Sequence, residues 1–534
     1  MPGFEQTIIP FLTRAEKFYP EKEIVTRTND RIHRYSYSEA VERISQLANA
    51  LQYAGVSRRD RLGTFSFNHF RHFEIYFGVP GIGAQYHTIN PFLPDKHIEH
   101  IVKDAEDKWI FIDPSLLEKL ERALSTETAS SIERFVVMGD SIPETSLDPV
   151  IDYESLIGGH PTHYEWPQLD ENLPASMCYT SGTTGMPKGV EYTHKMMWSH
   201  SMACLTPQGY GVDDSDTIMS GVPMFHVNSN DSPFFGAAAG AKQVLVGESP
   251  DPKDYVSLIQ EEDVTLSFAV PTICLGIIEY IEENDLDLPS FERIQMGADS
   301  VSQNLIRRFE DQGIEVLHGW GMTEALPLCT ASRPKPKMND WDQPRKLNKK
   351  TKIGVPLPGV ETKVVNNDGN EVPWDGESFG ELYVRGPWIT TEYFNRPAEN
   401  EASFKGKWLK TGDIVTVDEE GYFDLIDRNK YLIKSGGEWI SSMQLEKAIE
   451  SHDHVITAGV IGVPDAKWGE RPVAYIVCDS DRRGKQISDS LRNQISAEFP
   501  DWWTPDEFIY VNNLPETATG KIDKEELENR YQQR

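Results

Sequence analysis

The sequence contains one stretch whose residue types suit the binding of a polyphosphate. Residues 180–189 hold three glycines, four hydroxyl side chains and Lys188, and they follow an apolar segment. Glycine permits a tight turn close to a ligand, while hydroxyls, backbone N–H groups and a lysine can all bind phosphate oxygens. Pro187 and Gly189 flank the lysine where the common P-loop has glycine and serine or threonine, which excludes that motif. Alone, the stretch is equally consistent with an ordinary surface turn.

Two further clusters carry residue types that could complete a nucleotide site. Residues 319–324 (Gly-Trp-Gly-Met-Thr-Glu) follow a predicted strand, so we expect them at the carboxyl end of a sheet, where open α/β sheets bind ligands. Trp320 could stack on a base, and Glu324 could bind Mg²⁺, which prefers one or two carboxylates among other oxygen ligands. In residues 408–413, Asp413 could accept hydrogen bonds from ribose hydroxyls. Each cluster alone could also be purely structural.

The elements that would position these clusters alternate between strands and helices, which predicts βαβ units and parallel sheets. Ser38 is the predicted N-cap of the helix that begins at Glu39. The polar residues 331–352 are interpreted as a surface loop, and the pattern from Gly380 onward is β-rich. Predicted strands lie at 61–67, 109–112, 135–138, 217–224, 242–246, 295–298 and 314–318, and predicted helices at 39–53, 73–77, 234–241 and 255–261.

A polar break at residues 427–430 separates two apolar strands and predicts a domain boundary. The roughly 100 residues beyond it match the size of a small domain and alternate strands with helices at 443–452 and 487–499. The predicted fold class is α/β. A large N-terminal domain (1–427) would contain parallel or mixed sheets flanked by helices plus a β-rich subdomain, and a small, mobile α+β domain (428–534) would follow.

Composition excludes several classes of partner. The chain of 534 residues has 84 acidic and 52 basic residues, a net charge of −32, which argues against nucleic acid and against stable binding to anionic lipid. The longest uncharged apolar run, residues 264–278, is too short to span a bilayer and is interpreted as a strand, a turn at Pro271 and a helix. We identify no signal peptide at the N-terminus. The five cysteines lack metal-ligand spacing, which favours reduced thiols in the cytoplasm.

Taken together, the clusters resemble the motifs of the acyl-adenylate-forming superfamily, which includes acyl-CoA synthetases, firefly-type luciferases and peptide-synthetase adenylation domains. The chain is most similar to the fatty-acyl-CoA synthetase branch, and the resemblance covers essentially the whole sequence in both order and spacing. The matching segments are 179–190, 320–324 (Trp-Gly-Met-Thr-Glu), 410–413 (Lys-Thr-Gly-Asp), 427–428 (Asp-Arg), 434–441 (Lys-Ser-Gly-Gly-Glu-Trp-Ile-Ser), 462–465 (Gly-Val-Pro-Asp) and 518–521 (Ala-Thr-Gly-Lys).

The resemblance implies an ATP-dependent, AMP-forming acid–CoA ligase that uses Mg²⁺. A carboxylate attacks the α-phosphate of ATP, giving acyl-AMP and pyrophosphate, and the thiol of coenzyme A then displaces AMP. Thr184 and Glu324 would bind the metal. Asp413 and Arg428 would bind the ribose. The implied ATP- and AMP-binding residues are Thr180, Ser181, Gly182, Thr183, Thr184, Gly185, Lys188, Gly297, Ala298, Gly319, Trp320, Gly321, Thr323, Asp413, Arg428 and Lys521.

The resemblance also assigns residues to catalysis, to a hinge and to the acyl and CoA path. Lys521 would bridge the substrate carboxylate and the α-phosphate, a role suited to a flexible ammonium group. Lys430 would be the hinge about which the small domain rotates, although Tyr431 stands where many relatives have aspartate. His226 would lie near the reacting carboxylate and gate the entry of CoA. The remaining residues of this path are Val227, Asn230, Lys434, Gly436, Gly437, Glu438 and Trp439.

The sequence says less about which carboxylic acid is the substrate than about the reaction. Neither His226 nor Val227 supplies the aspartate with which amino-acid-activating relatives pair the substrate ammonium, so a peptide-synthetase role is not expected. Asn230 stands where some long-chain relatives have a gating tryptophan, which favours short- to medium-chain acids. A long-chain ligase, a luciferase-like oxygenase and a relative that only binds nucleotide remain alternatives. Members of this branch are often homodimers.

Replacing Lys521 with alanine separates the two half-reactions. We expect Lys521→Ala to nearly abolish acyl-AMP formation, because the charge at the reacting α-phosphate is lost. Thioester formation from supplied acyl-AMP should continue at close to the wild-type rate. Single-turnover measurements of both halves make the comparison, and an equal loss in both would contradict the assigned role.

Overall fold

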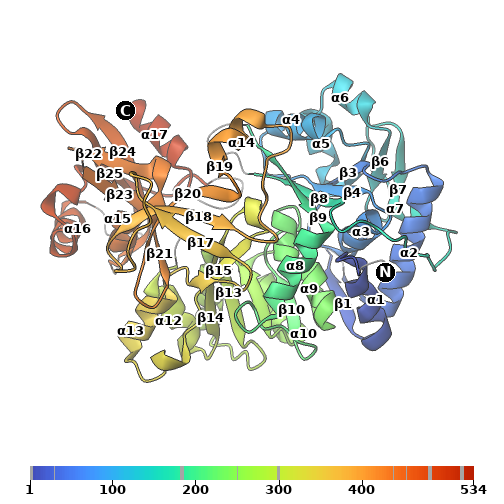
Figure 1. The fold of residues 1–534 in the computed structure, drawn as a ribbon, viewed down its shortest axis with the longest axis horizontal. Helices are drawn as coiled ribbons and strands as arrows, with labels where there is room; N and C mark the ends of the chain where they lie inside the picture. Colours follow the sequence, from blue (N-terminus) through green and yellow to red (C-terminus); the bar gives the residue numbers. More distant parts are fainter. Residues whose placement is uncertain are drawn as a thin grey trace.

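The computed structural model describes residues 4–28, 31–180, 186–248, 250–297, 301–436, 438–452, 454–478, 484–516 and 522–534. These residues form four β-sheets with their flanking helices, and Figure 1 shows the whole chain. Of the predicted site residues, eight lie outside the described residues: Ser181, Gly182, Thr183, Thr184, Gly185, Ala298, Gly437 and Lys521.

The first sheet has the strand order β7-β6-β5-β3-β4-β8-β9, and all neighbours are parallel except β8 and β9. Helices connect β3 to β4, β4 to β5 and β5 to β6, as the predicted βαβ pattern requires, whereas a described segment without a helix connects β6 to β7. The strands are β3 (Arg61–Phe65), β4 (Gln85–Thr88), β5 (Trp109–Ile112), β6 (Arg134–Val137), β7 (Val150–Asp152), β8 (Pro174–Tyr179) and β9 (Gly189–Thr193). The helices are α2 (Tyr37–Tyr53), α3 (Phe70–Gly81), α4 (Asp95–Ala105), η1 (Pro114–Leu116), α5 (Leu117–Ala123), α6 (Thr126–Ser131) and α7 (Tyr153–Ile157).

The second sheet has the order β16-β15-β14-β13-β12-β10-β11-β1-β2, with parallel strands from β14 to β1 and antiparallel strands at both edges. Its strands are β1 (Glu23–Arg27), β2 (Ile32–Ser36), β10 (Thr217–Ser220), β11 (Lys242–Leu245), β12 (Leu266–Ala269), β13 (Arg293–Gly297), β14 (Glu315–Gly321), β15 (Leu328–Ala331) and β16 (Val355–Pro356). Its helices are α1 (Ile9–Phe18), α8 (His194–Leu205), η2 (Val227–Asp231), α9 (Ser232–Ala239), α10 (Pro252–Glu262), α11 (Pro271–Glu283), α12 (Gln303–Asp311), η3 (Thr323–Ala325), η4 (Pro336–Met338) and α13 (Gln343–Lys350).

The helices of these two sheets pack against each other around a shared apolar core. Tyr76 and Phe77 of α3 contact Phe234 of α9, with ring centroids 5.7 and 5.0 Å apart, and all three side chains are fully buried. Burying each such side chain contributes about 1.5–3 kcal/mol. Separate apolar clusters cover the outer faces, with α10 to α12 on the second sheet and α4 and α5 on the first. The predicted α/β architecture with helices on both faces is confirmed.

The third and fourth sheets follow in sequence. The third is antiparallel, consisting of β17 (Glu361–Val365), β18 (Phe379–Arg385), β19 (Phe404–Lys405), β20 (Trp408–Val417) and β21 (Phe423–Arg428), with α14 (Pro397–Ser403) between β18 and β19. The fourth consists of β22 (Leu432–Ser435), β23 (Glu438–Ser441), β24 (Val455–Asp465), β25 (Gly469–Cys478) and β26 (Glu507–Val511). Its helices are η5 (Asn429–Tyr431), α15 (Ser442–Glu450), α16 (Lys485–Glu498), η6 (Asp501–Trp503) and α17 (Lys524–Gln532).

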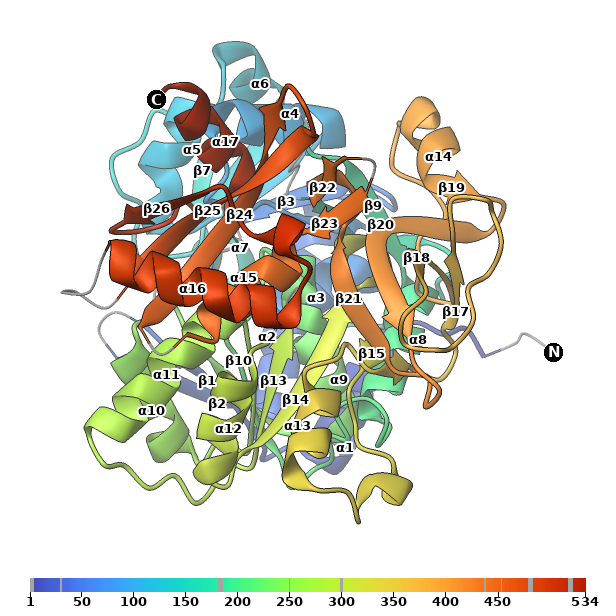
Figure 2. The same cartoon turned by 90° about the vertical axis from the view of Figure 1, so that its left-hand side faces the viewer.

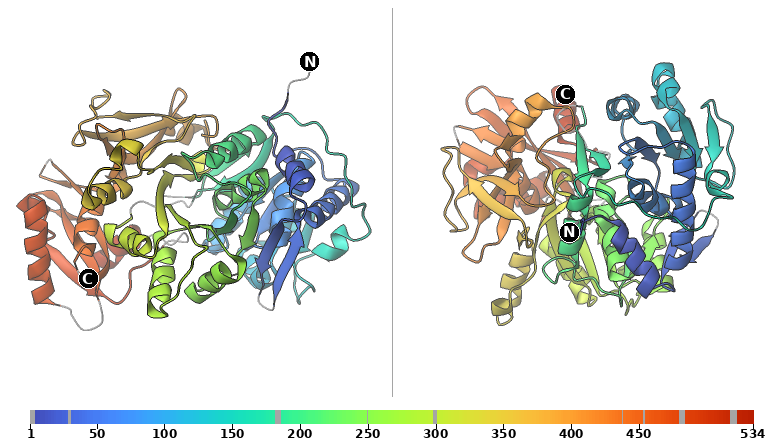
Figure 3. Two further views of the ribbon diagram at one scale, coloured as in Figure 1. Left: turned by 90° about the horizontal axis from the view of Figure 1, so that it is seen from below. Right: turned by 45° about the vertical axis from the view of Figure 1, so that its right-hand side comes forward.

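The fourth sheet and its helices form the small C-terminal domain. They have apolar clusters of their own, and Figure 2, which views this end of the molecule, shows α15 and α16 lying across the sheet. In Figure 3 these orange and red elements lie at one end of the molecule, and the blue N-terminal elements lie at the other. The predicted β-rich subdomain corresponds to the third sheet, whose strands lie in the sequence between those of the second sheet and those of the fourth.

Three local predictions are corrected. The N-cap of α2 is Ser36, not Ser38, because Ser36 Oγ accepts the Glu39 N–H and the Glu39 carboxylate accepts the Ser36 N–H, a complete capping box. Residues 331–352 include helix α13, which begins after the N-cap Asp342. The strand expected to end at His318 continues as β14 to Gly321, where an added Cβ would lie only 1.8 Å from the Pro327 carbonyl oxygen.

Candidate active site

The described ends of the predicted phosphate loop form the base of an antiparallel hairpin. Strand β8 leads into the loop and β9 leads out of it. The Thr180 N–H donates to the Lys188 carbonyl at 3.0 Å, and the Lys188 N–H donates to Thr180 Oγ1 at 3.2 Å. A Cβ at Gly189 would lie 2.5 Å from Met177 Cε, so a larger residue there would require the Met177 side chain to move. The loop therefore begins and ends at fixed positions, whereas residues 181–185 lie outside the described part of the chain.

Three of the predicted nucleotide-binding residues meet in one cluster, in which Trp320 and Asp413 are buried and Arg428 is partly exposed. The Trp320 indole N–H donates to Asp413 Oδ2 at 2.9 Å, and Arg428 Nε lies 3.3 Å from Asp413 Oδ1. Asp413 and Arg428 are opposite each other on β20 and β21, while Trp320 comes from β14. Trp320 and Asp413 are each 3% exposed. The tryptophan that we expected to frame adenine thus also fixes the carboxylate expected to bind ribose.

Two predicted glycines lie side by side next to this cluster. Gly297 at the end of β13 pairs with Gly319 on β14. An added Cβ at Gly319 would lie 2.8 Å from Leu328 Cδ1. Gln295 Nε2 would lie 3.1 Å from a Cβ at Gly319 and 3.2 Å from a Cβ at Gly297. The absence of side chains at the two glycines therefore lets Gln295 and Leu328 pack closely against the backbone here.

Glu324 is held by a residue that the sequence analysis did not single out. The Tyr393 hydroxyl donates to Glu324 Oε1 at 2.6 Å, and the Lys188 ammonium lies 4.0 Å from the centre of the Tyr393 ring. The neighbouring Thr323 carbonyl accepts the Tyr192 hydroxyl at 2.6 Å. Glu324 is 6% exposed. Burial, followed by the negative charge of Glu324, raises the pKa of Tyr393, so its hydroxyl remains a donor.

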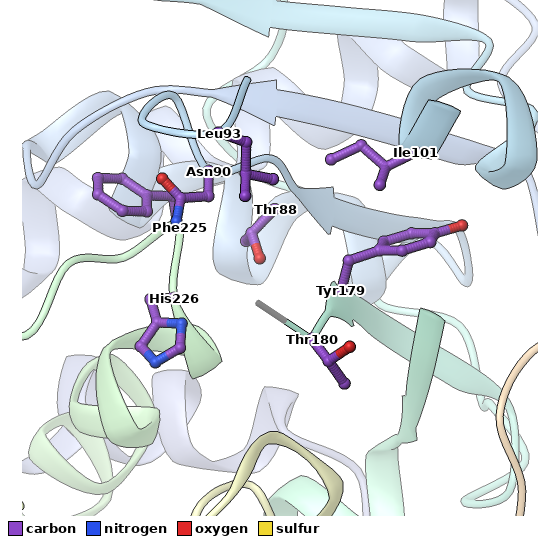
Figure 4. A pocket seen from close by; sticks show the side chains of 8 residues that line it. All are labelled: Thr88, Asn90, Leu93, Ile101, Tyr179, Thr180, Phe225 and His226. Carbon is purple, nitrogen blue, oxygen red and sulfur yellow. The ribbon is translucent and has the colours of Figure 1, made fainter. Parts of the chain in front are cut away.

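A small pocket brings the loop together with His226 (Figure 4). Its polar walls come from the ends of β4 and β8, where parallel strands present their carboxyl ends. Thr88, Thr180 and His226 lie around the centre of the view in Figure 4. The sequence analysis identified two of the lining residues as site residues and missed the others, which are Thr88, Asn90, Leu93, Ile101, Tyr179 and Phe225.

The segment after His226 has an unusual backbone. All five residues of η2, from Val227 to Asp231, have φ between 45° and 60°, a left-handed conformation that is a genuine outlier for a β-branched residue such as Val227. Buried partners hold the turn: Asn228 Oδ1 accepts from Ser176 Oγ at 3.0 Å, and His200 Nδ1 lies 2.9 Å from Asp231 Oδ2. Burial raises the pKa of Asp231. Strain of this kind clusters at functional sites.

The predicted hinge lies where the third sheet gives way to the fourth. Strand β21 ends at Arg428, and β22 begins at Leu432. Burial and the positive charge of Arg428 lower the pKa of Lys430 to about 8, and its ammonium lies 4.3 Å from the Tyr431 ring centre. Just before the hinge, the fully buried Asp427 accepts from Ser442 Oγ at 2.8 Å and from the Met443 N–H at 3.1 Å.

The residues predicted for the CoA side lie on the β22–β23 hairpin. The Lys434 ammonium lies 4.7 Å from the Trp439 ring centre, and the Gly436 N–H donates to the Trp468 carbonyl at 2.7 Å. Glu438 begins β23, and Gly437 lies outside the described residues. In Figure 1 this hairpin lies beyond β20, on the far side from β8 and β9, so the structure does not bring it together with the pocket at His226.

Comparison with known proteins assigns the chain to a family. Residues 12–394 match the model of the AMP-binding enzyme, and residues 444–521 match the model of the AMP-binding enzyme C-terminal domain. The chain belongs to the AMP-binding enzyme family. In the described part of this family member, no helix combines the length and apolar character needed to cross a membrane.

Its similar proteins include three CoA ligases. The chain is 39% identical over 531 residues to a long-chain-fatty-acid–CoA ligase of Thermus thermophilus, covering 99% of this chain and 96% of the relative. It is 36% identical to a medium-chain-fatty-acid–CoA ligase of Ectopseudomonas oleovorans, with 97% and 94% coverage. It is also 36% identical to a 3-methylmercaptopropionyl-CoA ligase of Ruegeria lacuscaerulensis, with 98% and 97% coverage.

Solved structures of similar fold include two with bound acyl-adenylates. An anthranilate CoA ligase in complex with anthranoyl-AMP has a TM-score of 0.88 at 23% identity, covering 99% of this chain and 98% of that one. The o-succinylbenzoate CoA synthetase of Bacillus subtilis, in complex with its acyl-adenylate intermediate, has a TM-score of 0.81 at 25% identity, with 98% and 99% coverage. These structures show the same fold, and the predicted superfamily is confirmed by the two family models and by the CoA ligases at 36–39% identity.

Replacing Trp320 tests whether its hydrogen bond supports AMP binding. Trp320→Phe keeps a buried ring but removes the N–H that fixes Asp413. A hydrogen bond to a charged group contributes about 1.5–3 kcal/mol, so we expect the Kd for AMP, measured by isothermal titration calorimetry, to rise by roughly tenfold or more. Trp388→Phe is the matched control, because the buried Trp388 donates its indole N–H to the Leu328 carbonyl. Equal effects of the two substitutions would argue against a specific role for Trp320.

Proposed function

We propose that the chain is an AMP-forming acid–CoA ligase that activates a fatty or related carboxylic acid through an acyl-AMP intermediate. The observation that carries the proposal is the convergence of three motifs that are distant in sequence: Lys188 of the phosphate loop, Trp320 and Glu324 of residues 319–324, and Asp413 of residues 408–413, which pairs with Arg428. The CoA ligases among its relatives support the same reaction. Its substrates are ATP, an acid and coenzyme A.

In the first half-reaction the protein positions ATP and neutralises charge. Asp413 and Arg428 bind the ribose hydroxyls, and Gly297, Gly319 and Trp320 frame the adenine. Lys188 and the loop hold the β- and γ-phosphates, so the departing pyrophosphate stays bound while the acid carboxylate attacks the α-phosphate. Lys521 stabilises the charge that develops there. Phosphoryl transfer depends on positioning and charge neutralisation of this kind.

The residues around Glu324 suit Mg²⁺. Its carboxylate is nearly buried, and among the described residues no lysine or arginine forms an ion pair with it. A buried anion without a cationic partner is costly, and a hard divalent cation satisfies it. Glu324 and Thr184 would hold the ion, which neutralises phosphate charge when bound. Thr184 lies outside the described residues.

In the second half-reaction the thiol of coenzyme A attacks the acyl-AMP carbonyl and AMP leaves. We assign to His226 the control of access to that carbonyl, and its position in the same pocket as Thr180 supports this role. The β22–β23 hairpin, with Lys434, Gly436, Glu438 and Trp439, supplies the CoA-facing surface once the small domain has turned. Val227 and Asn230, both buried in the left-handed turn, border the acyl path.

The turn of the small domain takes place about Lys430. We divide the chain into residues 1–427 and 428–534, with a hinge at 427–431. The division is supported by the change of sheet between Arg428 and Leu432 and by the separate apolar clusters of the C-terminal elements. Hinges of this kind are a few residues at the ends of elements that absorb large φ/ψ changes.

The acid is proposed to be of short or medium chain length, because Asn230 replaces a gating tryptophan. The alternative is a long-chain fatty acid, because the similar proteins include a long-chain as well as a medium-chain fatty-acid–CoA ligase. A cytoplasmic location is part of the proposal and is supported by the five cysteines, which are all buried and lack metal-ligand spacing. A homodimer, common in the fatty-acyl branch, is also part of it, and light scattering on the purified protein tests the mass.

A coupled assay tests the reaction and the acid together. Pyrophosphate release should require both ATP and an acid, and AMP release should then require coenzyme A. Across straight-chain acids from acetate to hexadecanoate, we expect the highest kcat/KM between butanoate and decanoate. Adjacent members should differ modestly, since apolar pockets discriminate a methylene by about 1–3 kcal/mol. Acid-independent pyrophosphate release, or oxygen consumption with light emission, would contradict a ligase.

The hinge is tested by fixing the backbone at Lys430. Lys430→Pro restricts φ at position 430 and the conformation of Asn429. We expect one half-reaction to lose most of its rate while the other keeps it, because the small domain can no longer exchange positions. Lys430→Ala removes the same side chain without restricting φ and should retain both. If both half-reactions of Lys430→Pro match those of Lys430→Ala, the hinge does not lie there.

A further inference from the structure

One segment of the third-sheet region connects the two halves of the phosphate and metal site. Residues 389–394 lie between β18 and α14. The Thr390 N–H donates to the Glu324 carbonyl at 2.8 Å, and the Phe394 N–H donates to the Gly189 carbonyl at 2.8 Å. Backbone bonds therefore tie this segment at one end to the residue expected to bind Mg²⁺ and at the other to the exit of the phosphate loop.

Tyr393 reaches both of these parts with its side chain. Its hydroxyl donates to Glu324 Oε1 at 2.6 Å, and its ring lies beneath the Lys188 ammonium at 4.0 Å. The side chain itself is 4% exposed. Its backbone is fixed by Asn400, whose Oδ1 accepts the Tyr393 N–H at 2.6 Å and whose Nδ2 donates to the Tyr393 carbonyl at 3.1 Å.

The two contacts have different physical effects. The hydroxyl occupies one carboxylate oxygen of Glu324, which fixes the rotation of the carboxylate and leaves Oε2 to face a cation. Such hydrogen bonds orient metal ligands, and their loss typically costs 10–100-fold in metal affinity or activity. The ring attracts the Lys188 ammonium through its negative π face. A single rigid side chain thus holds an anionic group at its hydroxyl and a cationic group over the face of its ring.

We propose that Tyr393 is a positioning residue that sets Glu324 for the metal and Lys188 for the phosphates. The proposal rests on the metal and phosphate roles given to these two residues in the proposed function. It predicts that the hydroxyl controls metal binding, whereas the ring controls phosphate binding, so the two functions of this side chain can be separated by substitution.

Tyr393→Phe and Tyr393→Leu make this separation. Mn²⁺ binding is measured by electron paramagnetic resonance in the presence of α,β-methylene-ATP, which cannot be cleaved between the α- and β-phosphates. For Tyr393→Phe we expect the Kd for Mn²⁺ to rise by about tenfold or more, with little change in nucleotide affinity at saturating metal. For Tyr393→Leu we expect the same increase in the Kd for Mn²⁺ and, in addition, weaker binding of the nucleotide at saturating metal.

The Mg²⁺ dependence of pyrophosphate release provides a second test. A residue that only stabilised the fold would not change this dependence. Raising Mg²⁺ should restore most of the pyrophosphate-release rate of Tyr393→Phe, because the carboxylate remains and only its orientation is lost. The isosteric Phe variant keeps the test decisive even if the Leu variant does not fold. Tyr422→Phe is the matched control: Tyr422 is also buried and donates its hydroxyl to the Arg333 carbonyl, with no contact to Glu324.

The outcomes separate this proposal from the function on which it rests. Unchanged Mn²⁺ affinity in Tyr393→Phe, or an equal loss in Tyr422→Phe, would overturn the role of Tyr393 while leaving a ligase intact. A wild-type protein that binds Mn²⁺ with the nucleotide, loses that binding in Tyr393→Phe and yet releases no acid-dependent pyrophosphate would support Tyr393 and reject the ligase.

Discussion

A carboxylate removed from water must be met by hydrogen-bond donors or by a cation, and this constraint organises the candidate site. Asp413, Glu324 and Asp427 are at most 6% exposed, and each belongs to a different motif. Their donors, Trp320, Tyr393 and Ser442, come from other elements. Leaving such a group unpaired costs more than the bond itself contributes. The third sheet must therefore lie against the second, and α15 against β21.

Much of the architecture follows from short-range patterns, and those parts were predictable. The strand–turn–helix at residues 264–278 appears as β12 and α11 around Pro271, because an apolar run broken by proline has few alternatives. The choice between Ser36 and Ser38 was also available in the sequence. Only Ser36 has a glutamate three residues later, and the capping box depends on that spacing.

Other features depend on contacts that no local pattern encodes. The left-handed turn from Val227 to Asp231 opposes the intrinsic preference of its residues and is held by Ser176 and His200. Tyr393 lies in residues 389–394, which contain no glycine, histidine or lysine. Nothing in this segment therefore indicated a functional residue from the sequence alone. The importance of Tyr393 depends on Glu324, 69 residues earlier, and on Lys188. The family motifs predicted which residues face the ligands, whereas the structure identified the residues that contact those predicted site residues.

The buried bonds of Asp427 also bear on the proposed rotation of the small domain about Lys430. Asp427 precedes Lys430, whereas Ser442 and Met443 follow it. If the small domain rotates about Lys430, each rotation must therefore break the hydrogen bonds that Ser442 and Met443 donate to the fully buried Asp427 carboxylate, and other donors must replace them. A few such bonds amount to a few kcal/mol, enough to make one arrangement the resting state. A difference of this size lies within reach of a ligand that binds the other arrangement more tightly. The occupancy of the nucleotide site, and not the linker alone, would then determine which arrangement prevails.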